Sequence, residues 1–167
     1  MSINEGVLNR LKRDFHQNRD DETLLFADEV EENLFWDWFQ NEAEQYTISN
    51  TPNGTLIGAH NLGARCFGNS QTICRNLDLV YCEGFGLTNN DEYFLHGFNL
   101  NASNLVEDYT VLSNRGAFPV LPTVYYGVRI DKDFIEANNY DLLDNDAVNI
   151  PPLLLEYYRQ KLSTGQI

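Results

Sequence analysis

The chain presents a thiol, an imidazole and a carboxylate in that order, at Cys66, His96 and Asp108. A thiol attacks an acyl carbon as the thiolate, so it needs a neighbouring base, and a carboxylate can orient that base. Cys66 also stands where a helix is expected to begin, and the N-terminus of a helix favours the charged thiolate. Order, residue types and position therefore predict a Cys-His-Asp nucleophile system.

The residues around Cys66 are candidates for binding the oxyanion that such a nucleophile creates. First-turn amides have no partner within their helix, so the backbone N–H groups of Cys66 and Phe67 are free to donate. The side chains of Asn69, Ser70 and Gln71 are further candidates for oxyanion binding or substrate positioning. Asn69 is equally ordinary in the first turn of any helix, so both interpretations of that residue stay open.

The choice of Asp108 as the third member depends on the turn between two predicted strands. A three-residue loop beginning at Asn101 places Asp108 directly opposite His96, within reach of its imidazole. A loop of two or four residues would instead oppose Glu107 to His96, because a one-residue slip exchanges the faces of a strand. Asp108 is the preferred third member, and Glu107 is the alternative.

Each of these residues also has a structural interpretation when it is taken alone. A lone cysteine is commonly a small buried apolar residue, and a lone histidine is more often structural than catalytic. The ordered combination favours catalysis. The other two cysteines, Cys74 and Cys82, are spaced in a way that matches no zinc motif, and no phosphate-binding loop, GxSxG or HExxH sequence occurs. The sequence therefore predicts neither a metal nor a cofactor.

Two helices are predicted before the nucleophile. Residues 7–17 carry apolar side chains at helical spacing, and a longer helix is predicted from Asp21 or Thr23 to Tyr46. The acidic residues near its start are expected to face solvent. Its apolar face is expected to comprise Ala27, Val30, Leu34, Phe35, Trp38 and Phe39. The aromatic run 34–39 could form a ligand platform, but a helix that covers a core needs the same residues, and the core interpretation is favoured.

The centre of the chain is predicted to be a cysteine-bearing helix on an antiparallel sheet. A loop or hairpin is expected over residues 47–64, and 118–122 reads as irregular. The helix of Cys66 is expected to end near Asn76, followed by strands at 77–87, 93–100, 105–112 and 123–130, and by helices from Asp131 or Asp133 and over 152–162. We therefore predict one α+β domain, 1–167, with a helical N-terminal part (1–46), a catalytic core (57–130) and C-terminal helices (131–167).

The formal net charge of −14 restricts the partners that the protein can have. An acidic surface repels phosphate backbones and anionic lipids, so neither nucleic acid nor a membrane is expected. A basic protein partner is compatible with this charge, although acidity is also a common means of solubility. No apolar run approaches the ~20 residues that span a bilayer, and no secretory pattern opens the chain. A cytoplasmic location with reduced thiols is expected.

The residues around the three candidates resemble a known superfamily. The runs in question are Cys66-Phe67-Gly68-Asn69-Ser70, Tyr81-Cys82-Glu83-Gly84, His96-Gly97-Phe98 and Asp108-Tyr109-Thr110. They are similar to the C-F-x-N-S, Y-x-E-G, H-A-W and D-P-T runs at the core of the transglutaminase-like and papain-like cysteine superfamily, particularly its small bacterial and phage proteins. The similarity covers about residues 57–130 and departs from the pattern at Gly97, Phe98 and Tyr109.

The resemblance implies a papain-like or transglutaminase-like core in which Cys66 is the nucleophile, His96 the base and Asp108 its orienting group. The implied activity is that of a hydrolase or acyl transferase, which acts on an amide or other acyl group of a peptide, protein or small molecule through a thioester. A phage-encoded member would act in the host cytoplasm. The alternative is a non-catalytic bacterial or phage binding or inhibitor module that keeps the fold and binds a basic protein. In a third possibility the N-terminal helices occlude the site, with Trp36 or Trp38 filling the cleft.

Overall fold

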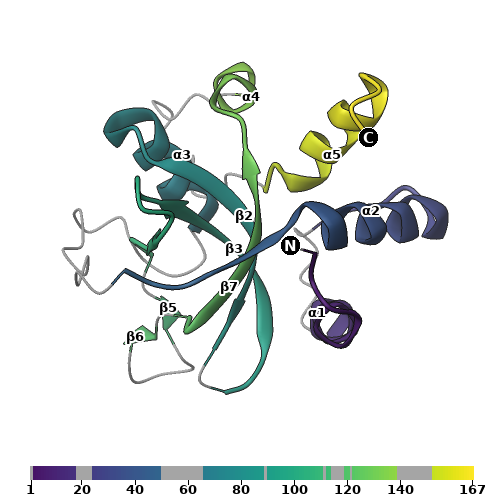
Figure 1. The fold of residues 1–167 in the computed structure, drawn as a ribbon, viewed down its shortest axis with the longest axis horizontal. Coiled ribbons are helices and arrows are strands. Elements are labelled where there is room, and N and C mark those ends of the chain that lie inside the picture. The colour runs from purple at the N-terminus through teal and green to yellow at the C-terminus, as the bar shows by residue number, and fades with distance from the viewer. Residues whose placement is uncertain are drawn as a thin grey trace.

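The chain folds as an α+β protein in a computed structural model, which describes residues 2–17, 24–49, 66–88, 90–110, 112–113, 119–120, 122–138 and 152–167. Five helices lie in this described part (Figure 1): α1 (Glu5–Gln17), α2 (Glu29–Glu42), α3 (Cys66–Leu77), α4 (Lys132–Ala137) and α5 (Leu154–Ser163). None of these helices is long and apolar enough to cross a membrane.

A curled antiparallel sheet forms the centre of the fold, in the order β1-β7-β2-β3-β4 (Figure 1). Its strands are β1 (Glu44–Tyr46), β2 (Val80–Leu87), β3 (Tyr93–Leu100), β4 (Val106–Glu107) and β7 (Val124–Ile130). A separate pair consists of β5 (Leu112–Ser113) and β6 (Pro119–Val120). At the middle of the sheet, Gly84 lies between His96 and Gly127, and a Cβ there would come 1.9 Å from a backbone oxygen of β7. Only glycine permits this approach of the strands.

The main core lies between one face of the sheet and helices α1, α2 and α5. The indole of Trp36 packs on Phe85 of β2, with ring centroids 5.7 Å apart, and on Phe15 of α1 at the same separation. The aromatic run of α2 is therefore core, as predicted, because Phe35, Trp36, Trp38 and Phe39 are all buried. Trp36 and Trp38 belong to this core, so the observation that would favour occlusion of the site, a cleft at Cys66 filled by either ring, is not made among the described residues. Truncating one of these rings would cost about 3–5 kcal/mol.

The second helix differs from its prediction at its start, on one face and at its end, since it stops at Glu42 and the last predicted residues form β1. It begins at Glu29, because the carboxylate of Asp28 accepts a hydrogen bond from the Glu31 amide and caps the first turn. Val30 and Leu34, predicted to be buried, are 66% and 50% exposed. The reason is that the larger aromatic rings occupy the core side. The earlier predicted caps, at positions 21 and 23, lie outside the described residues.

The third predicted strand is broken. Strands β2, β3 and β7 lie within the predicted ranges, and β3 has the predicted bounds, whereas residues 105–112 form only β4 and the start of β5. The Val106 amide donates a hydrogen bond to the Thr47 backbone oxygen, and the Val106 oxygen accepts one from the Ser49 amide. Residues 47–49 therefore occupy the outer edge of β4. The range 118–122, predicted to be irregular, contains β6. The predicted loop beyond Ser49, including the approach to Cys66, lies outside the described residues.

Candidate active site

Cys66 is the first residue of α3, as predicted, and is buried with 6% of its surface exposed. The helix is held close to β3 at two points. The Asn99 side chain donates to the Ser70 backbone oxygen at 2.9 Å, and a Cβ on Gly97 would lie only 3.0 Å from the Phe67 ring and 3.3 Å from the Cys66 oxygen. The departure from the superfamily pattern at Gly97 thus permits close packing of the cysteine-bearing turn on the strand.

His96 and Asp108 form a fully buried pair. The Nε2 atom of His96 lies 2.7 Å from Oδ2 of Asp108, and neither side chain is exposed. The Tyr125 hydroxyl donates to the same oxygen at 2.9 Å, and the Thr110 amide donates to Oδ1 at 3.0 Å. Three donors therefore hold one carboxylate, which satisfies its charge in a site that water does not reach.

The environment favours the protonated imidazole. Burial acts to lower the pKa of His96, but the charge of Asp108 and its hydrogen bond to the ring, together with Cys66, raise it to about 10. Cys66 is near His96 in the fold, because the Cys66 backbone oxygen would lie 3.3 Å from a Cβ on Gly97, the residue after His96. Nδ1 of His96 has no hydrogen-bond partner within the described part of the chain. With Nε2 held by Asp108, Nδ1 is the ring nitrogen that can exchange a proton with Cys66, and such contacts often tighten only with substrate.

The contact between His96 and Asp108 is observed, but the register predicted to produce it is wrong. Leu100 pairs with Val106, so the loop runs from Asn101 to Leu105, two residues longer than predicted. The cause is the Asn101 side chain, whose oxygen accepts from the amides of residues 103 and 105 and shapes a wider turn. A register shift of two residues leaves Asp108 on the same face of the sheet as His96. Asp108 therefore becomes the diagonal neighbour of His96 rather than its direct partner.

Glu107, the alternative third member, does not contact His96. It pairs in register with Asn99, and its carboxylate accepts from Asn101 at 3.3 Å and from the Tyr109 hydroxyl at 2.7 Å. Adjacent residues on a strand point to opposite faces, which separates Glu107 from the imidazole. The structure thus brings Asp108 to His96 and leaves Glu107 outside the cluster.

Three of the residues predicted to assist the nucleophile have different positions. Phe67 packs against Gly97, next to Cys66. The Asn69 amide donates to the Thr110 hydroxyl at 3.0 Å and so ties the first turn of α3 to the residue that holds Asp108. Gln71 is fully buried, and its amide donates to the Tyr81 hydroxyl at 3.3 Å. Tyr81 lies on the opposite face of β2 from the glycine that pairs with His96, so Gln71 is turned away from the imidazole.

Sequence reasoning missed Tyr125, the hydroxyl donor to Asp108. Tyr125 belongs to β7, and β2 lies between it and β3. It reaches Asp108 because β2 has glycine at positions 84 and 86 on this face, so no side chain intervenes. The Tyr125 ring lies 6.2 Å from that of His96. Local patterns do not reveal a contact between residues of strands that are not neighbours. The one sequence signal for it was the pair of glycines in Gly84-Phe85-Gly86.

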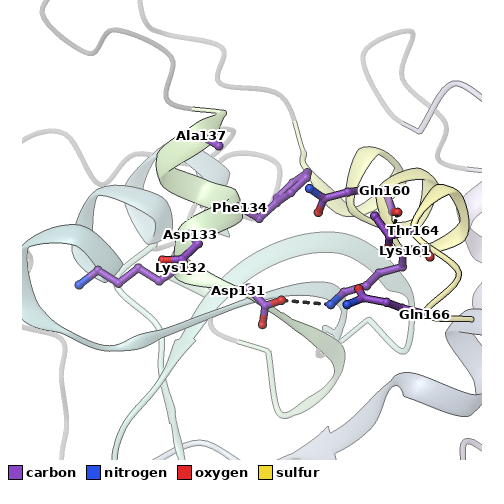
Figure 2. A pocket seen from close by; sticks show the side chains of 9 residues that line it. All are labelled: Asp131, Lys132, Asp133, Phe134, Ala137, Gln160, Lys161, Thr164 and Gln166. Carbon is purple, nitrogen blue, oxygen red and sulfur yellow. Dashed lines mark hydrogen bonds and ion pairs between the residues drawn. The ribbon is translucent and has the colours of Figure 1, made fainter.

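A separate hollow of about 540 Å³ lies between α4 and α5 (Figure 2), but it does not include the candidate residues. Its most prominent polar contact is the ion pair of Lys161 with Asp131, 3.1 Å long, so these two charges already satisfy each other. No cluster of three His, Cys, Asp or Glu side chains able to hold a metal ion occurs among the described residues.

Comparison of the chain with protein-family models, with curated proteins and with solved structures found no match.

Proposed function

We propose that the protein is a cysteine-nucleophile hydrolase or acyl transferase with a papain-like or transglutaminase-like core. The observation that carries the proposal is the buried His96–Asp108 pair, 2.7 Å long, beside the first residue of α3. A buried imidazole with its pKa raised by a carboxylate and a thiol is what a thiolate–imidazolium pair requires. The three cysteines are free, which fits a reducing compartment, and we place the protein in the cytoplasm.

The reaction proceeds in two stages. His96 takes the proton of Cys66, and the thiolate attacks the acyl carbon, forming a C–S bond and an oxyanion that the amides at the start of α3 bind. The oxyanion collapses, the bond to the leaving amine breaks, and His96 returns the proton to that amine. His96 then takes a proton from water or from an acceptor amine, which attacks the thioester and releases Cys66. Asp108 keeps Nε2 engaged throughout, so that Nδ1 carries the proton in transit.

Selective alkylation tests the proposal without knowledge of the substrate. Iodoacetamide is added in slight excess at pH 7, and each cysteine is quantified by peptide mass spectrometry. Cys66 is expected to react at least about tenfold faster than Cys74 and Cys82, since burial raises the pKa of both other thiols. Labelling of Cys66 no faster than that of Cys74 would contradict the proposal.

The second candidate is a non-catalytic module that binds a basic protein, which the net charge of −14 favours. The two candidates differ in the variants that abolish function. For the module, Cys66→Ala preserves partner binding, and reversal of surface carboxylates abolishes it. For the enzyme, Cys66→Ala removes turnover while binding of the substrate persists.

A further inference from the structure

Large apolar side chains exposed to solvent gather where α2 and α5 lie side by side (Figure 1). The described part of the chain has seven exposed large hydrophobic residues, and five of them belong to this region: Leu25, Val30, Leu34, Leu162 and Ile167. Their exposed fractions range from 47% to 66%. Single apolar residues on a surface need no explanation, but a cluster of this kind marks an interaction surface.

Three of these residues, Leu34, Leu162 and Ile167, line a groove of about 380 Å³. Its base is firm, because Trp38 of α2 and Tyr158 of α5 are buried with ring centroids 5.2 Å apart. Its edges are the exposed side chains of Leu34 and Leu162, together with Ile167. The Arg159 guanidinium binds Glu31 through two nitrogens and fixes α5 against α2. The groove is therefore preformed and apolar, which is the character of a site for apolar side chains of a partner.

Among the described residues, the exposed charges beside the groove that form no ion pair are negative. Glu29, Asp37 and Glu42 are exposed on α2, and Glu42 lines the groove itself. Within the described part of the chain, the nearby cations are already engaged, since Arg159 binds Glu31 and Glu156, and Lys161 binds Asp131. An occupant with a complementary surface therefore carries apolar side chains flanked by positive charge.

The same charge excludes two other occupants. A second copy would oppose this acidic rim to an identical one, and an anionic lipid surface would be repelled by a protein of net charge −14. Val30 and Leu34 are one helical turn apart on the surface of α2, which matches the spacing at which a docked helix presents its anchors. We propose that this groove binds an amphipathic helical segment of a partner protein, with two or three large apolar residues on one face and lysine or arginine beside them. The inference is independent of the cysteine site.

A synthetic helical peptide with leucine on one face and lysine elsewhere tests the proposal on the full chain. Binding is followed by calorimetry and by tryptophan fluorescence, because Trp38 lines the groove whereas Trp36 is fully buried. The expected result is saturable binding of one peptide per chain. A scrambled peptide of the same composition and a leucine–glutamate peptide are expected to bind at least about tenfold more weakly.

Substitutions on the surface test whether the peptide binds in this groove. The pair Leu34→Gln with Leu162→Gln is expected to weaken the basic peptide about tenfold, and Asp37→Asn with Glu42→Gln to weaken it several-fold with reduced salt dependence. Leu77→Gln is the matched control, since Leu77 is 51% exposed but lies on α3, and it is expected to leave the affinity unchanged. Three outcomes would overturn the proposal. The first is that the basic peptide does not bind. The second is that the scrambled peptide binds as tightly, or that all variants bind the basic peptide equally well. The third is that the chain self-associates and Leu34→Gln abolishes this self-association.

Discussion

Two buried carboxylates, Asp108 and Glu83, have different roles because different groups surround them. Asp108 faces an imidazole, and the Tyr125 hydroxyl and a backbone amide complete its coordination. Glu83 has no charged partner in the part of the chain that the structure describes, and its oxygens accept from the amides of Leu153 and Leu154 at 2.6 and 2.7 Å and from the Tyr81 hydroxyl. Both have almost no exposed surface, so the difference lies in their donors.

The donors give the two carboxylates different tasks. Burial raises the pKa of Glu83 to about 7, although the hydrogen bonds from Leu153, Tyr81 and Leu154 oppose the rise. Glu83 binds the free amides at the start of α5 and thereby fixes that helix to β2. Asp108 instead stabilises the proton on His96. One carboxylate supports the fold, and the other supports a proton that the proposed chemistry moves.

The largest expected effect separates Asp108 from its neighbour. Asp108→Asn removes the charge that raises the pKa of His96, so that burial lowers this pKa and the imidazole loses its proton at neutral pH. The alkylation rate of Cys66 at pH 7 is expected to fall about tenfold or more. Glu107→Gln is the matched control and is expected to leave the rate unchanged. An equal loss in both variants would remove the distinction between the two acids.

Glu83→Gln is expected to affect stability and not Cys66. The amide of glutamine offers one acceptor oxygen, so one buried N–H at the start of α5 loses its partner, at a cost of about 1–3 kcal/mol in the free energy of unfolding. The measurement is urea denaturation, with Cys66 alkylation in parallel. A tenfold fall in that alkylation rate, with unchanged stability, would show that the roles of the two carboxylates are reversed.

The same residue makes stability depend on pH with a definite sign. The pKa of Glu83 is raised from 4.5 to about 7 in the folded protein, so the folded state binds its proton more tightly than the unfolded state. The stabilisation from this group is complete below pH 4.5 and is lost as pH rises through about 7, a change of about 3 kcal/mol at most. The slope is expected to disappear in Glu83→Gln, and its persistence would assign it to another group.

A smaller effect is expected at Tyr125. Tyr125→Phe keeps the ring but removes one of the three donors to Asp108, which lowers the free energy of unfolding by about 1–3 kcal/mol. The alkylation rate of Cys66 is expected to fall a few-fold, less than in Asp108→Asn, because Thr110 and His96 still hold the carboxylate. Tyr109→Phe is the matched control, since that hydroxyl binds Glu107 instead. A rate change in the control and none in Tyr125→Phe would show that the second donor is dispensable.

Local patterns predicted the parts of the site that a few consecutive residues determine. The helix that begins at Cys66 and the bounds of β3 were predicted, because helix and strand propensities act within one element. The exposed position of Val30 did not follow from periodicity, since a helix with apolar residues on much of its surface does not specify which side meets the core.

Contacts made across elements were not predictable from the sequence alone. The length of the loop after Leu100 depends on one side chain, that of Asn101, which bonds two backbone amides. Asp108 still lies on the predicted face of the sheet, because the observed loop is longer than the predicted one by an even number of residues. Tyr125 joins the site only because the sheet order places β7 next to a strand with glycine at the crossing.

The central claim is that Asp108 keeps His96 protonated beside Cys66, and nuclear magnetic resonance of ¹⁵N-histidine-labelled protein tests it directly. The chain has three histidines, and loss of one signal in His96→Gln assigns the resonance. Both ring nitrogens of His96 are expected to remain protonated at pH 8, with loss of the proton near pH 10. Loss of the proton near pH 6.5, as in an ordinary histidine, would show that Asp108 does not keep His96 protonated.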